Sequence, residues 1–316
     1  MDLSMDTLSV ALLPLILAFI MFALGLSMQI ADIKYIAKEP KPFIIGFIAQ
    51  LVLLPVVTFV LILLLKPAPA FAFGFMLLSF CPGGVTSNML CTLLKGNLPL
   101  SVALTSVMSL VSIFTVPVLT AWAYGHFLGT EGGSINLVSM GVKMFLITAL
   151  PVGLGIFIHE KKPAFTKAHR DKFMKAAFVL FTLLVVVAIF SNREVLFNES
   201  GQITIMIVTL LLALFVIGLG IPKLLGLSWK DAKTIGMEVG IQNSSMALAL
   251  SGILAVSSES VLPAFALPAG VYSVVMYLVA IPYIWLFRRF NDWYSFNLTL
   301  TVIDAYDRLF IFNSLL

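Results

Sequence analysis

Two short stretches decide how this sequence folds: Cys81-Pro82-Gly83-Gly84-Val85-Thr86-Ser87-Asn88 and Glu238-Val239-Gly240-Ile241-Gln242-Asn243. Each lies within a long apolar run, and its glycine, proline and amide residues interrupt the apolar pattern. Proline lacks the amide proton that a helix interior needs, and glycine weakens a helix. We therefore predict two helices that are broken near their centres.

The composition around these stretches predicts an all-α polytopic membrane protein. The chain has 316 residues, of which 60% are hydrophobic and 11% are charged, with a mean hydropathy of +1.09. Soluble domains carry about 25% charged residues, and a helix that spans a bilayer needs about 20 apolar residues. Nine runs meet this need: residues 8–28, 43–65, 69–95, 98–126, 135–158, 173–190, 202–225, 231–256 and 263–287.

The order of these runs predicts two related halves. Runs 43–65, 69–95 and 98–126 resemble runs 202–225, 231–256 and 263–287 in length and order, and the middle run of each set is the interrupted one. Nine spans would place the two sets in opposite directions, as inverted repeats. Paired interrupted helices in inverted repeats are typical of a transporter that binds its substrate near the membrane midplane.

Lysine and arginine residues predict the orientation, because cytoplasmic loops carry the positive excess. Most of the 19 basic residues, Lys233 among them, fall in loops that face the cytoplasm if the N-terminus is outside. We expect one transmembrane domain over residues 1–290 in a plasma or inner membrane, and a cytoplasmic tail over 291–316. The net charge of +4 then reflects topology. It is therefore no sign of a nucleic-acid partner, and nothing in the sequence indicates a protein partner.

Glu238 is the one acidic residue, among 15, that lies deep within an apolar run. Ionisable residues at membrane depth are costly and usually functional, although a protonated Glu238 bonded to a neighbour would also fit. Oxygen-bearing side chains follow both breaks, and such oxygens suit a hard monovalent cation. A helix that restarts after a break also presents free amides to an anion. The two breaks therefore predict neighbouring cation and anion sites.

Three other polar residues have two readings when each is taken alone. Ser101 and Thr105 lie four residues apart and face the same way in a helix. Hydroxyls in helices also bond to their own backbone, which fits the pair equally well. Gln50 lies in the middle of an apolar run and needs a polar partner there, which a neighbouring helix would also supply.

Taken together, these segments resemble the bile acid:sodium symporter family. The resemblance rests on Phe22-Ala23-Leu24-Gly25-Leu26, Ile48-Ala49-Gln50 with Pro55, Cys81 to Asn88, Leu98 to Thr105, and Glu238 to Asn243. It implies a core domain in which two broken helices cross, packed against a panel domain. The nine-run layout resembles the nine-helix form found in animal members.

The resemblance also implies two Na⁺ ions and an organic anion as ligands. One ion would be held by Ser87, Asn88, Ser101, Thr105 and Glu238. The other would be held by Gln50, Glu238, Gln242 and the carbonyls of Val239 and Ile241. The substrate would lie near Asn243 and Thr86, and no transition metal is implied.

The function that we expect is sodium-coupled symport of an organic anion, bile-acid-like or smaller, by alternating access. A proton-coupled exporter or antiporter, in which Glu238 titrates, is an alternative within transport. A receptor or scaffold that transports nothing is another. An enzyme is not expected, because no His, Cys or paired-carboxylate set in the runs forms a catalytic group.

Overall fold

The computed structural model describes residues 5–28, 38–129, 142, 145–191, 193–254 and 263–290. Over these residues the chain is helical apart from short turns and linkers, and no strand occurs in this part of the chain. The predicted tail 291–316 and the start of the predicted span 135–158 lie outside the described residues. An α-helical fold is confirmed.

Four helices in the described residues are long and apolar enough to cross a membrane: Pro40–Leu65, Leu98–Leu128, Gly201–Leu224 and Ala264–Phe287. Three shorter apolar helices accompany them: Pro14–Gly25, Pro69–Phe80 and Ser244–Leu254. These lengths support an integral membrane protein. The number of nine spans and the inverted repeat stay predictions.

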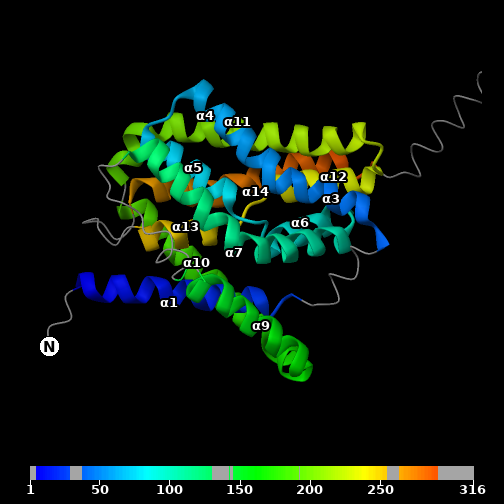
Figure 1. Ribbon diagram of the computed structural model, residues 1–316, viewed down its shortest axis with the longest axis horizontal. Helices are drawn as coiled ribbons and strands as arrows, with labels where there is room; N and C mark the ends of the chain where they lie inside the picture. Colours follow the sequence, from blue (N-terminus) through cyan, green and yellow to red (C-terminus); the bar gives the residue numbers. More distant parts are fainter. Residues whose placement is uncertain are drawn as a thin grey trace, which may run out of the picture.

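One side of the molecule is formed by α1 (Met5–Gly25), α9 (Leu150–Lys161) and α10 (Pro163–Ser191) (Figure 1). Helices α1 and α9 pack closely through two glycines. A Cβ atom on Gly25 would clash with the Val152 carbonyl oxygen, and one on Gly155 would lie 2.5 Å from the Phe22 carbonyl oxygen. Small residues let helix backbones approach in this way in membranes.

The remaining helices form a thicker layer against this side, with α4 (Leu54–Leu65) and α11 (Arg193–Leu224) farthest from α1 (Figure 1). Between them lie α5 (Pro69–Phe80), α7 (Leu98–Leu128) and α14 (Leu267–Phe287). Helix α3 (Pro40–Ile48) continues into α4 through a π-helical turn, η2 (Ala49–Leu53). Pro55 follows this turn, and its missing amide proton breaks the regular hydrogen-bond pattern there.

Both predicted helix breaks are confirmed. Helix α5 ends at Phe80 and α6 (Val85–Leu93) begins after the linker 81–84, which we call the first break. Helix α12 (Trp229–Gly240) ends before the linker 241–243, the second break, and α13 (Ser244–Leu254) follows. The two breaks touch: the Asn243 amide donates to the Pro82 carbonyl at 2.9 Å, and Gly83 pairs with Gln242 as an isolated antiparallel bridge.

Two helices are longer than the hydropathy predicts. The predicted span 173–190 lies within α10, and the span 202–225 lies within α11 except for its last residue; the two helices begin at residues 163 and 193. The added residues are largely charged or polar but include good helix formers such as Lys, Ala and Glu. A span predicted from hydropathy stops at the first polar residues, whereas these two helices continue through them.

The prediction that Lys233 lies in a loop is wrong. It belongs to α12 and is fully buried, with its Nζ 3.0 Å from the Phe290 carbonyl oxygen and 3.5 Å from that of Phe287. The Phe287 carbonyl ends α14 and also accepts from the Phe290 amide at 3.2 Å, while Phe290 lies three residues beyond the helix. A cation near a helix C-terminus bonds such carbonyls and interacts well with the helix dipole.

Candidate functional site

Glu238 is completely buried near the end of α12, and two hydroxyls of α7 reach its carboxylate. Ser101 donates to Oε1, and the Thr105 hydroxyl lies 3.0 Å from Oε2. The side-chain oxygen of Asn88, from α6, lies 2.7 Å from the same Ser101 hydroxyl. The predicted residues of three helices therefore meet at one point.

This group contains more acceptor oxygens than protons. The two hydroxyls of Ser101 and Thr105 carry one proton each. Around them stand three side-chain acceptors, the two oxygens of Glu238 and Oδ1 of Asn88, and the Gln50 amide lies only at 3.5 Å from Glu238 Oε2. Buried acceptors are normally paired, so the surplus favours either a bound cation or a proton on Glu238.

Two amide side chains lie next to this group. Gln50, in the π-helical turn η2, donates to the Glu238 carbonyl oxygen at 3.0 Å, and Gln242 donates to the Val239 carbonyl at 2.7 Å. The side-chain oxygens of Gln50 and Gln242 are both buried and make no hydrogen bond. Two unpartnered amide oxygens beside a carboxylate fit a cation that prefers oxygen ligands.

The first break comes very close to this group, which explains why glycine occupies position 83. A Cβ atom there would lie 2.7 Å from Glu238 Oε2, 3.2 Å from Gln50 Nε2 and 3.3 Å from Ser87 Oγ. Ser87 itself is fully buried, and its hydroxyl donates to the Gly84 carbonyl at 2.6 Å. Among the described residues, no cluster of three or more His, Cys, Asp or Glu side chains could hold a metal ion.

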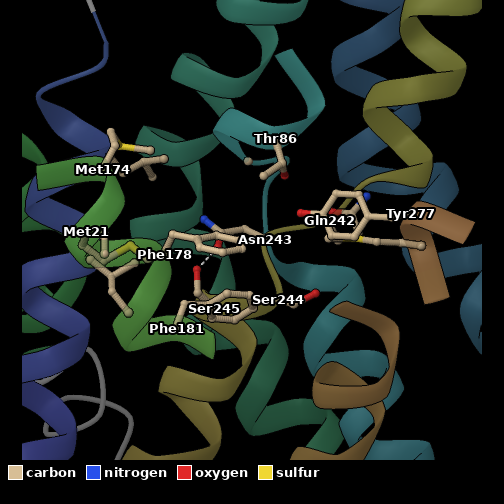
Figure 2. Close-up of a pocket in the computed structure, with 15 residues that line it drawn as sticks. Met21, Thr86, Met174, Phe178, Phe181, Gln242, Asn243, Ser244, Ser245 and Tyr277 are labelled. Carbon is tan, nitrogen blue, oxygen red and sulfur yellow. Dashed lines mark hydrogen bonds between the residues drawn. The ribbon is translucent and has the colours of Figure 1, made fainter. Parts of the chain in front are cut away.

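A cavity of about 110 Å³ lies beside the two breaks. Figure 2 shows apolar side chains of α1 and α10 on one side, such as Met21 and Phe178, facing Thr86 and Asn243. Thr86 stands in the first turn of α6, and the Asn243 side chain caps α13 by accepting from the Met246 amide at 3.1 Å. The predicted substrate residues thus line a cavity at two helix N-termini.

None of the described residues that line this cavity is charged. They are Ile20, Met21, Leu24, Gly84, Thr86, Met174, Ala177, Phe178, Phe181, Gln242, Asn243, Ser244, Ser245, Met276 and Tyr277. The charge of an anion would therefore be met by helix N-termini and a neighbouring cation. The apolar wall suits the hydrocarbon part of an amphipathic ligand.

Sequence reasoning missed the tyrosines of α14. The Tyr272 hydroxyl donates to the Gly240 carbonyl at 2.8 Å, where α12 ends, and the Tyr283 hydroxyl donates to the Lys233 carbonyl at 3.1 Å. Tyr277 lines the cavity. Aromatic residues within an apolar run are typical of any packed helix, so the sequence carried no signal for these contacts.

Comparison with known proteins identifies relatives of this chain. The model of the Sodium Bile acid symporter family matches residues 14–199. The chain is 32% identical to the uncharacterized sodium-dependent transporter YocS of Bacillus subtilis over 264 residues, which cover 82% of this chain and 77% of that protein.

Two other relatives come from a plant and a mammal. The probable chloroplastic sodium/metabolite cotransporter BASS2 of Oryza sativa is 29% identical over 83% of this chain, and the ileal sodium/bile acid cotransporter of Oryctolagus cuniculus is 26% identical over 83%. The matched part spans 60% of the rice protein and 74% of the rabbit protein. By the family match and by these relatives, the chain belongs to the sodium bile acid symporter family.

Proposed function

We propose that this protein is a secondary transporter that couples the entry of Na⁺ to the transport of an organic anion. The observation that carries the proposal is the buried, acceptor-rich oxygen group around Glu238, directly beside a cavity at two helix N-termini. The names of the relatives agree with sodium coupling. Catalysis plays no part in this proposal.

Two Na⁺ ions account for the two sets of oxygens. The first ion takes Ser87, Asn88, Ser101, Thr105 and Glu238. The second takes Gln50, Glu238, Gln242 and the carbonyls of Val239 and Ile241. The unpartnered oxygens of Gln50 and Gln242 support the second position. Two ions predict that uptake rises with Na⁺ concentration with a Hill coefficient above 1.

The cargo binds at Asn243 and Thr86, with its charge toward the helix N-termini and its apolar part against α1 and α10. A second, much smaller cavity of about 10 Å³ shares Met21, Leu24 and Asn243 with the first and reaches Ser109 of α7 on its other side. Because Met21 and Leu24 of α1 and Asn243 of the second break line both cavities, the proposed passage between them is a shift of α1 against the breaks. Such a shift is alternating access, in which one layer moves against the other.

The membrane arrangement that we propose has nine spans, with the N-terminus outside and the C-terminus in the cytoplasm. Lys66 and Lys95 are both exposed, at opposite ends of the segment 66–95. In sealed vesicles of one orientation, a membrane-impermeant maleimide should label only one of the variants Lys66→Cys and Lys95→Cys. Labelling of both or neither would contradict the arrangement.

Sodium coupling is tested by the thermal stability of the purified protein in NaCl and KCl at matched ionic strength. A ligand that binds the folded state raises the unfolding midpoint by mass action. We expect a Na⁺-specific rise that Glu238→Gln abolishes. Glu194→Gln, a control at an exposed position of α11, should keep it.

Two results would count against sodium coupling. If NaCl and KCl changed the unfolding midpoint of the wild type equally, sodium coupling would lose its support. A strong pH dependence without a Na⁺ response would instead favour the proton-coupled alternative, because the acceptor surplus can also be met by a proton on Glu238. Accumulation of labelled carboxylates in proteoliposomes under a Na⁺ gradient would then separate a transporter from a receptor.

A further inference from the structure

Three polar residues outside the proposed ion ligands join the start of α7 to α12, and we call them the Asn97 cluster: Asn97, Asp231 and Thr234. The Asn97 amide donates to the Thr234 hydroxyl at 2.7 Å, and the Asn97 side-chain amide donates to Asp231 Oδ1 at 2.7 Å. Thr234 is fully buried. Side-chain contacts of this length between two helices fix their register.

The helix ends on both sides hold this cluster in place. Asn97 caps α7 by accepting from the Leu100 amide at 3.3 Å. Ser228 caps α12, since its hydroxyl accepts from the Asp231 amide at 3.0 Å and lies 2.6 Å from Asp231 Oδ2. The cluster therefore joins two capped helix starts, where the backbone is well defined.

The turn before α7 is shaped to bring its backbone onto Thr234. Lys95 has a positive φ of 55°, which ends α6 sharply. A Cβ atom on Gly96 would clash with the Thr234 hydroxyl, so only glycine allows this approach. The contact is thus built by the backbone of the turn as well as by side chains.

The Asn97 cluster lies one helical turn from the Glu238 site in both helices. Ser101 follows Asn97 by four residues, and Glu238 follows Thr234 by four residues. Residues four apart share a helix face. The pairing of Asn97 with Thr234 therefore sets the pairing of Ser101 with Glu238.

We propose that the Asn97 cluster is a positioning device for the sodium site, which keeps the hydroxyls of α7 aligned with Glu238 when no ion is bound. The proposal rests on the proposed sodium coupling. Without the cluster, Na⁺ would have to order the two helices itself, and its apparent affinity would fall. Ligands held in place before binding cost less to organise.

The test compares Thr234→Val with Thr234→Ser and Thr58→Val by Na⁺ titration of the unfolding midpoint. Thr234→Val keeps the shape but removes the acceptor of the Asn97 amide, and Thr234→Ser keeps that acceptor. Thr58 is a matched control: it is fully buried and bonds back to the Leu54 carbonyl at 2.8 Å, as Thr234 bonds back to Lys230 at 2.7 Å.

We expect Thr234→Val to raise the half-saturating Na⁺ concentration about fivefold, the change that corresponds to one net hydrogen bond. Thr234→Ser and Thr58→Val should keep the wild-type value. If Thr234→Val proves too unstable to purify, Asp231→Ala against Asp231→Asn makes the same comparison, since Asn retains an acceptor oxygen for Asn97.

Two outcomes overturn the proposal in distinguishable ways. If the wild type responds to Na⁺ and Thr234→Val lowers the midpoint equally at all Na⁺ concentrations, the cluster is only structural and the sodium site stands. If the wild type shows no Na⁺-specific response, sodium coupling itself fails and the positioning role falls with it.

Discussion

The two broken helices meet at one place but are built differently. Helices α5 and α6 contain no charged residue, and the first break is made by Pro82 and two glycines. Helix α12 carries four charged residues in twelve, and no proline stands in the second break. The first helix is thus interrupted by its own backbone chemistry, whereas the second relies on partners in α7 and α14.

The largest expected effect comes from filling the space at the first break. Gly83→Ala places a Cβ atom against Glu238 and Gln50, and overpacking of this kind costs about 1–3 kcal/mol. Because these neighbours are proposed ion ligands, we expect the Na⁺-specific rise in the unfolding midpoint to be lost as well.

Two glycines provide the controls. A Cβ atom on Gly84 would have its nearest neighbour at 3.4 Å, so Gly84→Ala should leave both stability and the Na⁺ response unchanged. Gly74→Ala, in the middle of α5, would press on the Phe265 carbonyl oxygen. It should lower stability but keep the Na⁺ response, because Gly74 adjoins no proposed ion ligand. Retention of the full Na⁺ response in Gly83→Ala would contradict the position of the ion.

The next largest effect is expected at Lys233 in α12, the helix that precedes the second break. Lys233→Met removes the cation that holds the carbonyls of Phe287 and Phe290. We expect a loss of about 2 kcal/mol in the free energy of unfolding, as for hydrogen bonds to charged groups. Lys230→Met, at an exposed position of the same helix, should change it little. Equal effects of the two changes in chemical denaturation would show that the buried contact adds nothing.

A smaller effect is expected at Tyr272, which holds the end of α12. Tyr272→Phe leaves the Gly240 carbonyl without this donor and should cost about 1 kcal/mol of stability. It should also raise the half-saturating Na⁺ concentration, because the carbonyls of Val239 and Ile241 flank Gly240. Tyr283→Phe removes a similar bond farther from the site. If it shifted the Na⁺ titration equally, a special role for Tyr272 would be excluded.

The smallest effect on stability is expected at Thr86. Its side chain is only partly buried and faces the cavity, so Thr86→Val should change the free energy of unfolding by no more than about 0.5 kcal/mol. The Na⁺ response should persist while the KM for a transported anion rises in proteoliposome uptake. An unchanged KM would remove Thr86 from the substrate site.

Local chemistry explains which parts of the fold were predictable from the sequence. The first break follows from Pro82 and its glycines, which do not continue a helix. The second is indicated by Gly240 and the amides that interrupt an apolar run, and the structure has both breaks. The sequence around Gln50, Ser101 and Thr105 allows two interpretations of each residue when it is taken alone. The structure brings all three to Glu238, while their role as ion ligands stays a prediction.

The contacts that escaped prediction depend on distant partners. The charge of Lys233 predicts a loop, because charged side chains usually face solvent, and nothing near it in the sequence reveals the carbonyls of Phe287 and Phe290. Tyr272 has an apolar setting, and its hydroxyl finds a carbonyl 32 residues away. The π-helical turn at Gln50 depends on how Pro55 disturbs the turn before it. The pattern of apolar residues cannot predict such a change of helix type.

The direct hydrogen bond between the two breaks has a consequence for how this protein evolves. It runs from the amide of Asn243 to the carbonyl of Pro82 and uses main-chain atoms alone. Among single substitutions at position 243, only Asn243→Pro deletes the donor. A changed side chain at position 243 would therefore lose the cap of α13 but keep the contact between the two breaks. Substitutions that alter the cargo can thus leave the backbone framework of the ion site in place.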